Sequence, residues 1–110
     1  MIKQIFLIKR KQGMSPDAFK AYYLGHHVPL VKAAFPELVK YVINFVQQGK
    51  RAAAYDAMTE LYWPDFETLK GLKESDAYRT KIAPDELNFM SSEGTLIFLA
   101  EEVVAKEVKA

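Results

Sequence analysis

The chain has 110 residues, the length of a single domain with its own core. Its formal net charge is +1 and its lysines and arginines are spread along the chain, so neither a nucleic acid nor a membrane surface is expected as a partner. Cysteine is absent, which excludes disulfides and sulfur-ligated metals. Since the first residues also contain no long apolar segment typical of a signal peptide, the composition favours a cytoplasmic protein.

The first half of the chain predicts a strand, an interrupted helix and a second strand. Residues 2–9 alternate but carry apolar side chains on both sides, as in a strand covered on both faces. Ser15-Pro16 is typical of a helix cap followed by the first helical residue. We expect this helix to kink or break at Gly25 and to restart at Pro29. Residues 38–46 are rich in β-branched and aromatic side chains and predict the second strand.

The second half repeats this order of elements after a loop at residues 48–51. Residues 56–63 alternate and predict the third strand. Asp65 can cap the helix that follows, and another short helix is expected to open at Pro84. Residues 95–104 predict the last strand. The order β-α-β-β-α-β indicates an α+β fold, a ferredoxin-like protomer with a four-stranded antiparallel sheet.

Helices cover only one face of such a sheet. The strands nevertheless carry apolar side chains on both sides, and no third layer of helices is predicted. A second copy of the chain is therefore expected to cover the open face, so that two protomers form a homodimeric α/β barrel around a central cavity.

Short segments across the chain have the composition and order of a known family's motifs. They are Met14 to Phe19, Tyr22 to Leu24, His27 to Val31, Val39 to Val42 with Asn44, Asp56 to Tyr62, Pro84 to Met90 and Phe98 to Val104. Together they resemble the EthD-like family of the dimeric α/β-barrel superfamily over nearly the whole chain. One departure is Val103, where relatives often carry a histidine.

The resemblance implies a ferredoxin-like protomer that dimerises and works without a cofactor. It also implies that small aromatic, lactone or polyketide-like compounds are isomerised, dehydrated or decarboxylated. The predicted function is therefore that of a cofactor-free isomerase or lyase that binds a small hydrophobic molecule. A cofactor-independent monooxygenase of the same superfamily and a non-catalytic ligand-binding dimer are the alternatives.

The two histidines of the chain are adjacent and are the first candidates for proton transfer. The family motif, fixed by Pro29-Leu30, matches its histidine to His27. A gap-free comparison with one member, 4-methylmuconolactone methylisomerase, instead matches the histidine to His26 and a strand tyrosine to Tyr41. Neighbouring residues on a helix point about 100° apart, so we do not expect both histidines to serve one site. Their spacing also predicts no metal site, and a hydrogen bond to the backbone is the alternative role for His27.

Four further residues complete the predicted site. Glu60 lies mid-strand among apolar residues, where a carboxyl in an apolar cavity would have a raised pKa and could exchange protons; an interface salt bridge is the alternative. Either Tyr41 or Asn44 could hold a carbonyl oxygen of the substrate, and only one of them can face the cavity because their odd offset places them on opposite faces of the strand. Ordinary packing on the strand is the alternative for Tyr41. Tyr62 shares a face with Glu60 and could line the cavity beside it. Tyr23 is a candidate for substrate binding, with core packing as the alternative.

Overall fold

The structure is a computed structural model that describes residues 1–47, 49 and 53–109. Four strands form one sheet, with bounds β1 (Ile2–Ile8), β2 (Lys40–Phe45), β3 (Ala57–Trp63) and β4 (Leu96–Ala100). Their order in space is β2-β3-β1-β4, and every neighbouring pair is antiparallel. The predicted ferredoxin-like α+β fold is confirmed. Of the loop predicted at residues 48–51, all but Gly49 lies outside the described residues.

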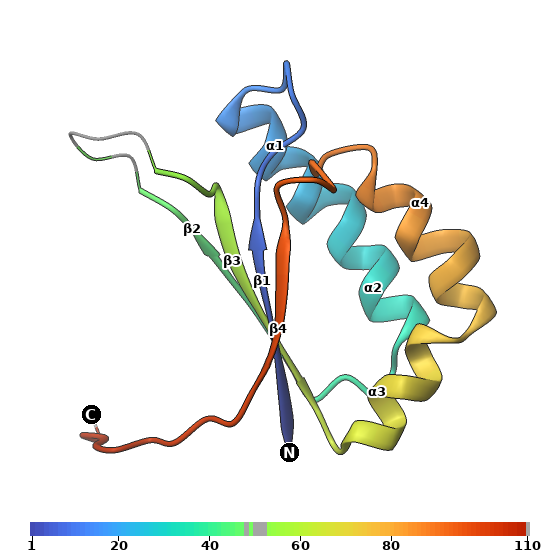
Figure 1. Cartoon of the computed structure of the whole chain (residues 1–110), viewed down its shortest axis with the longest axis vertical. Helices are drawn as coiled ribbons and strands as arrows, with labels where there is room; N and C mark the ends of the chain where they lie inside the picture. Colours follow the sequence, from blue (N-terminus) through green and yellow to red (C-terminus); the bar gives the residue numbers. More distant parts are fainter. Residues whose placement is uncertain (48, 50–52, 110) are drawn as a thin grey trace.

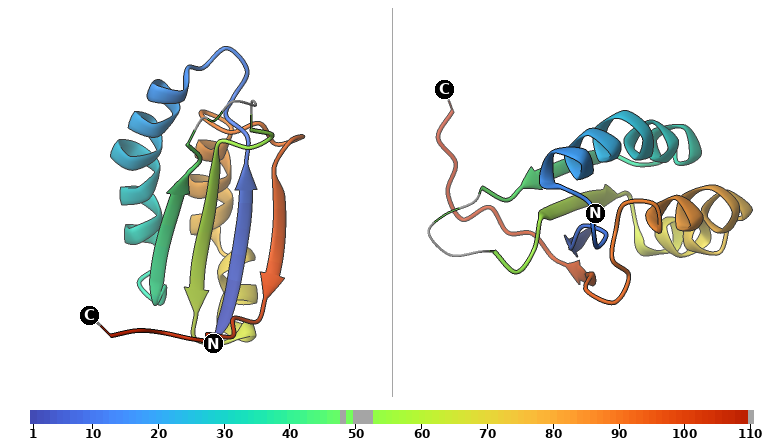
Figure 2. Two further views of the ribbon diagram at one scale, coloured as in Figure 1. Left: turned by 90° about the vertical axis from the view of Figure 1, so that its left-hand side faces the viewer. Right: turned by 90° about the horizontal axis from the view of Figure 1, so that it is seen from above.

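The helices form two arms that pack on the same face of the sheet (Figures 1 and 2). The first arm is continuous, with bounds α1 (Pro16–Tyr22), the π-helical turn η1 (Tyr23–His27) and α2 (Val28–Ala34). The second arm contains α3 (Phe66–Lys73), the π-helical turn η2 (Tyr78–Ile82) and α4 (Ala83–Glu86). No helix among the described residues is long and apolar enough to cross a membrane.

Side-chain caps start both arms where the sequence predicts them. The Ser15 hydroxyl accepts a hydrogen bond of 3.1 Å from the backbone N–H of Ala18, and Pro16 follows as the first helical residue. The Asp65 carboxylate accepts one of 2.7 Å from the N–H of Thr68. Each cap satisfies a backbone donor that the first helical turn leaves free.

The α-helix is interrupted around Gly25 and begins again at Val28, with Pro29 in its first turn as expected, but the chain does not leave the helix. The helix runs through this position as η1, in which the N–H of Val28 bonds the carbonyl of Tyr23 five residues back. Pro29 has no N–H for the carbonyl four residues before it, and the wider π turn absorbs this defect without ending the helix. The second arm repeats the arrangement, because η2 is followed one residue later by Pro84.

The last strand is shorter than predicted. β4 ends at Ala100, which lies opposite Lys3 near the beginning of β1, and beyond it few residues of the partner strand remain to pair with. Residues 101–109 then leave the sheet without regular structure, on the side away from the helices (Figure 1).

The core lies between the sheet and the two helical arms. One cluster of buried side chains consists of Ile8, Phe19, Tyr23, Ala57, Phe89 and Met90. The other consists of Val31, Phe35, Leu61, Trp63, Leu69 and Ile82. The opposite face of the sheet, here called the open face, carries no helix (Figure 2). Its apolar side chains include Ile5, Leu7, Val42, Met58, Leu96 and Phe98. Coverage of the open face by a second copy stays a prediction.

Candidate functional site

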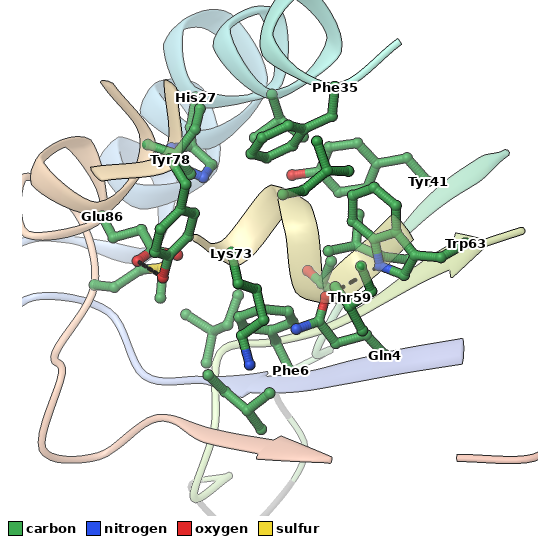
Figure 3. Close-up of a pocket in the computed structure, with 18 of the residues that line it drawn as sticks. Gln4, Phe6, His27, Phe35, Tyr41, Thr59, Trp63, Lys73, Tyr78 and Glu86 are labelled. Carbon is green, nitrogen blue, oxygen red and sulfur yellow. Dashed lines mark hydrogen bonds between the residues drawn. The ribbon is translucent and has the colours of Figure 1, made fainter. Parts of the chain in front are cut away.

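A cavity lies between the two helical arms and the sheet, with about 630 Å³ of free space including its opening to solvent. Its walls are largely aromatic, with side chains of Phe6, Tyr23, Phe35, Tyr41, Trp63 and Tyr78 (Figure 3). Two basic side chains, His27 and Lys73, and one acidic side chain, Glu86, also line the cavity. This cavity belongs to one protomer and lies on the helix side of the sheet, whereas the sequence predicted a cavity between the sheets of two protomers.

His27 stands at the end of η1 with its imidazole held against Asp85 of α4. Its Nδ1 donates a hydrogen bond of 2.8 Å to Oδ2 of Asp85, and both side chains are buried. The imidazole also packs against the ring of Phe89, with centroids 4.7 Å apart. This contact joins residues 58 positions apart in the chain and fixes both the orientation and the tautomer of the ring.

The second ring nitrogen of His27 is open to the cavity. Within the described residues, Nε2 has no hydrogen-bond partner, and no buried side-chain nitrogen or oxygen is left unpaired. Nε2 must therefore be reachable from the cavity that His27 lines. Burial lowers the pKa of His27, and the bond to Asp85 only partly opposes this effect. Near neutral pH the ring is thus mainly an uncharged base with its lone pair facing the cavity.

Asp85 is an ionised carboxylate held by several donors. Its Oδ1 accepts a hydrogen bond of 2.5 Å from the Tyr22 hydroxyl and one of 3.1 Å from the Asn88 amide. Burial alone would raise the pKa of Asp85, but the hydrogen bonds from Tyr22, His27, Asn88 and His26 together lower it to about 2.

The two histidines meet at this one carboxylate, although only His27 lines the cavity. The exposed His26 has its Nδ1 3.1 Å from Oδ1 of Asp85, while His27 occupies Oδ2. The π turn rotates less per residue than an α-helix, and the carboxylate offers two oxygens to the two rings. His26 nevertheless does not line the cavity.

Tyr41 and Tyr23, both predicted from the sequence, bring a row of hydroxyl groups to the cavity wall. The Tyr41 hydroxyl donates a hydrogen bond of 3.2 Å to that of Tyr23, which is 2.6 Å from the hydroxyl of Thr59. Burial raises the pKa of both tyrosines, so they stay protonated and can act as donors.

Glu86 is a second acid–base group on the cavity wall, and the sequence analysis assigned it no role. Burial raises its pKa to about 7, and the Tyr78 hydroxyl lies 3.5 Å from Oε1 (Figure 3). A signal was present in the sequence. Tyr78, Ile82, Glu86 and Met90 recur at every fourth position, and a carboxyl within such an apolar helical stripe is unusual.

Glu60, Tyr62 and Asn44 lie on the open face and do not reach this cavity. Glu60 forms a salt bridge of 2.5 Å with Lys3 and accepts a hydrogen bond of 3.3 Å from Asn44. The hydrogen bond from Lys3 lowers the pKa of Glu60, opposite to the rise predicted for a cavity carboxyl. Tyr62 donates to Glu102 over 2.7 Å. Alternation along β3 places Glu60 and Tyr62 on the face of the sheet opposite that of Thr59 and Leu61, so Glu60 does not share a cavity with His27 within one protomer.

Over the described ranges, no group of three or more histidine, cysteine, aspartate or glutamate side chains is arranged to hold a metal. The expectation of a site without metal or cofactor therefore stays a prediction that the arrangement of these side chains does not contradict. The cavity therefore combines a buried base, His27, with a row of hydroxyl groups and the carboxyl of Glu86, whose pKa is raised to about 7.

Comparison with solved structures identifies the same fold in other proteins. An ethyl tert-butyl ether d (ethd) family protein from Bacillus halodurans matches with a TM-score of 0.74 and 19% identity, over 94% of this chain and 100% of that chain. A dimeric protein of unknown function and ferredoxin-like fold from Bacteroides fragilis matches with 0.64 and 9% identity, over 92% and 95%. SnoaB, a cofactor-independent oxygenase from Streptomyces nogalater, matches with 0.63 and 9% identity, over 96% and 97%.

No curated protein matches the sequence. The family model of the EthD domain matches residues 11–93, which include α1, the turn that ends at His27, the strands β2 and β3, and the helix α4 with Asp85 and Glu86. The family predicted from the sequence motifs is therefore confirmed, and the chain belongs to the EthD domain family.

Proposed function

We propose that this protein is a cofactor-free acid–base enzyme of isomerase, dehydratase or decarboxylase type. One observation supports this above the others. The His27–Asp85 pair directs a free, uncharged nitrogen into a cavity whose walls are mostly apolar. A base in such a place is shielded from bulk water, and because its pKa is lowered it is unprotonated and able to accept a proton at neutral pH. Membership of the EthD family supports a small-molecule role of this kind. A cytoplasmic location is part of the proposal and rests on the absence of cysteine.

His27 Nε2 would take a proton from a carbon next to a carbonyl group of the substrate. The electrons of the broken C–H bond move onto the carbonyl oxygen and give an enolate, while Asp85 stabilises the imidazolium that forms. The Tyr41 hydroxyl is the donor proposed for the enolate oxygen, and its single proton, which points to Tyr23 in the free protein, would turn to the substrate. Return of this proton from the imidazolium of His27 to another carbon of the enolate completes an isomerisation and restores the neutral base. In a dehydration the enolate instead expels a hydroxyl group from the adjacent carbon, which takes the proton from the imidazolium and leaves as water.

The substrate is proposed to be a small, mostly apolar molecule with a carbonyl oxygen, such as an aromatic ketone or a lactone. Aromatic side chains on several walls favour a flat ring. The hydroxyls of Tyr23, Tyr41 and Thr59 supply the polar contacts that orient such a molecule.

We also propose that the protein acts as a homodimer joined through the open face of the sheet. Its apolar side chains include Met58, Leu96 and Phe98, which are 37%, 45% and 47% exposed in the single chain. An apolar surface of this kind marks an interface in soluble proteins. A dimeric protein of the same fold gives further support.

The experiment is proton exchange in heavy water. The protein is incubated with a panel of aromatic ketones and lactones, and loss of the C–H signal next to the carbonyl is followed by proton NMR. We expect exchange with the wild type and none above background with His27→Gln, after circular dichroism has shown that the variant is folded. Exchange at the wild-type rate in His27→Gln would end the proposal.

A cofactor-independent monooxygenase is the second candidate function. SnoaB is an oxygenase of the same fold, and a neutral buried base could equally deprotonate a phenol before it reacts with O₂. Oxygen consumption with candidate phenols separates the two functions. A third possibility, a binding protein without turnover, would be supported by a tightly bound molecule that mass spectrometry recovers unchanged after long incubation.

A further inference from the structure

Lys73 is a cation that the acid–base chemistry does not use, yet it lines the same cavity as His27. It is the last residue of α3, and its side chain extends from this helix toward the sheet (Figure 3). Lys73 is exposed, whereas His27 is buried, so the lysine stands where the cavity meets solvent. The exposed Ile97 of β4 lines the cavity too.

The ammonium group of Lys73 has no protein partner. Among the described residues, Lys3 and Arg10 form salt bridges with acidic side chains, but no salt bridge or hydrogen bond involves Lys73. Glu86, the acidic residue on the cavity wall, lies beyond salt-bridge distance from it. Because the pKa of Glu86 is raised to about 7, this carboxyl is largely uncharged in mildly acidic solution and then does not compete for the cation.

A cation at the opening of an apolar cavity attracts anions, since low-dielectric walls focus its field toward the entrance. The buried polar groups of the cavity are different in kind, for His27 Nε2 is uncharged and the tyrosines are neutral donors. The cavity thus combines neutral polar groups and aromatic side chains in its buried lining with one positive charge at its solvent-exposed part.

We propose that Lys73 binds an anionic group of the ligand, so that the cavity takes small aromatic or lactone compounds whose outer end carries a carboxylate. The inference rests on the proposed function, because it assigns the ligand class of the same cavity. The apolar ring lies between the walls and the carboxylate meets the Lys73 ammonium group at the opening. An uncharged compound of the same shape lacks this contact and binds more weakly.

Trp63 provides a test that needs no activity. It is the single tryptophan of the chain, it lines the cavity, and its indole N–H donates a hydrogen bond of 3.2 Å to Gln4. Its indole signal in a ¹H–¹⁵N NMR spectrum is therefore unambiguous and reports on occupation of the cavity. We would titrate the protein with trans-cinnamate and with its uncharged methyl ester, one pH unit below the pKa of about 7 of Glu86.

We expect cinnamate to bind more tightly than the ester in the wild type. Lys73→Met, which retains the apolar stem, should weaken binding of cinnamate about tenfold and leave binding of the ester unchanged. Lys73→Arg should restore the preference for the acid. Lys70→Met is the matched control, because Lys70 is exposed on the same helix but does not line the cavity.

Equal affinity for acid and ester, or equal losses in Lys73→Met and Lys70→Met, would overturn the inference and leave the proposed function standing. A Trp63 signal that neither probe moves at millimolar concentration would count against the cavity as a ligand site, and so against both proposals.

Discussion

At the scale of single residues, Asp85 decides what His27 can do. Its carboxylate holds the Nδ1 proton and so leaves Nε2 as the basic atom. It also raises the pKa of His27, against the larger lowering by burial. In Asp85→Asn the carboxylate no longer raises the pKa of His27, so this pKa falls further. Since activity is lost when His27 becomes protonated, the acidic limb of the pH–activity profile should move to lower pH.

We expect kcat/KM of Asp85→Asn to drop by about a hundredfold or more, since a positioned general base typically contributes at least about a hundredfold to the rate. The pKa itself is read from an NMR titration of the His27 ring. A pKa that is unchanged or higher in the variant would show that Asp85 does not act on the imidazole as described. His26→Ala is the matched control, because it removes a contact to the same carboxylate without reaching the cavity.

Glu86 gives the molecule a dependence of stability on pH that can be measured without a substrate. Burial raises its pKa from 4.5 to about 7, so between these values the folded state binds more protons than the unfolded state. The contribution of Glu86 to the free energy of unfolding therefore falls as pH rises from 4.5 through about 7. In Glu86→Gln this decline should disappear, as urea unfolding at several pH values would show. The same decline in both proteins would contradict the assignment.

The sequence indicated His27 as a candidate base but did not indicate its partner. His27 stands out because histidine titrates near neutral pH and its motif is specific, and Tyr41 because it matches a strand tyrosine of 4-methylmuconolactone methylisomerase. Asp85 forms its contact across 58 positions, and no local pattern encodes such a distance. Glu60 attracted attention as a carboxyl among apolar neighbours, but this pattern did not reveal that Lys3 pairs with it on the other face.

At the scale of elements, the π turn η1 is the form that the expected interruption of the first helix takes, and it also sets the geometry of the site. A glycine followed by a proline four residues later signals a disturbed helix, but the signal is the same for a kink and for a π turn. The turn η1 keeps the arm continuous and ends at His27, close to the carboxylate of α4.

Gly25 itself has no conformational need for glycine. It lies within helix, its φ is not positive, and a Cβ added there would meet no atom within 4 Å. Gly25→Ala should therefore stabilise the protein by about 0.5–1 kcal/mol, because alanine loses less backbone entropy in a helix. Urea unfolding measures the change. A loss of stability would mean that the backbone at this position is not helical. Gly13, whose φ is 86°, is the contrasting case, where alanine should destabilise.

At the scale of the whole molecule, the fold was predictable because its signals are regular and agree with one another. Alternation marked the strands, caps marked the helix starts, and the order of elements allowed few topologies. The position of the cavity was not predictable in this way. The position of the cavity depends on the distance between the two helical arms above the sheet. Side-chain packing sets this distance, and the periodic pattern of apolar residues does not encode it.

The open face of the sheet leaves large apolar side chains exposed in the single chain. Phe98 lies on the central part of β4, 47% exposed, and paired across the ladder with Ile5 of β1. If two protomers meet through this face, Phe98→Glu places a carboxylate in an apolar interface, where desolvation strongly disfavours it. The variant should sediment as a single chain while the wild type sediments as a dimer.

Leu87→Glu is the control for this change, because Leu87 is 59% exposed but follows α4 on the helix side. It should leave the mass in solution unchanged. A wild type that sediments as one chain, or a Phe98→Glu protein that remains dimeric, would contradict the interface. The cavity lies on the other side of the sheet, so a folded monomeric variant should still shift the Trp63 signal with ligand. Dimerisation and ligand binding can therefore be tested separately.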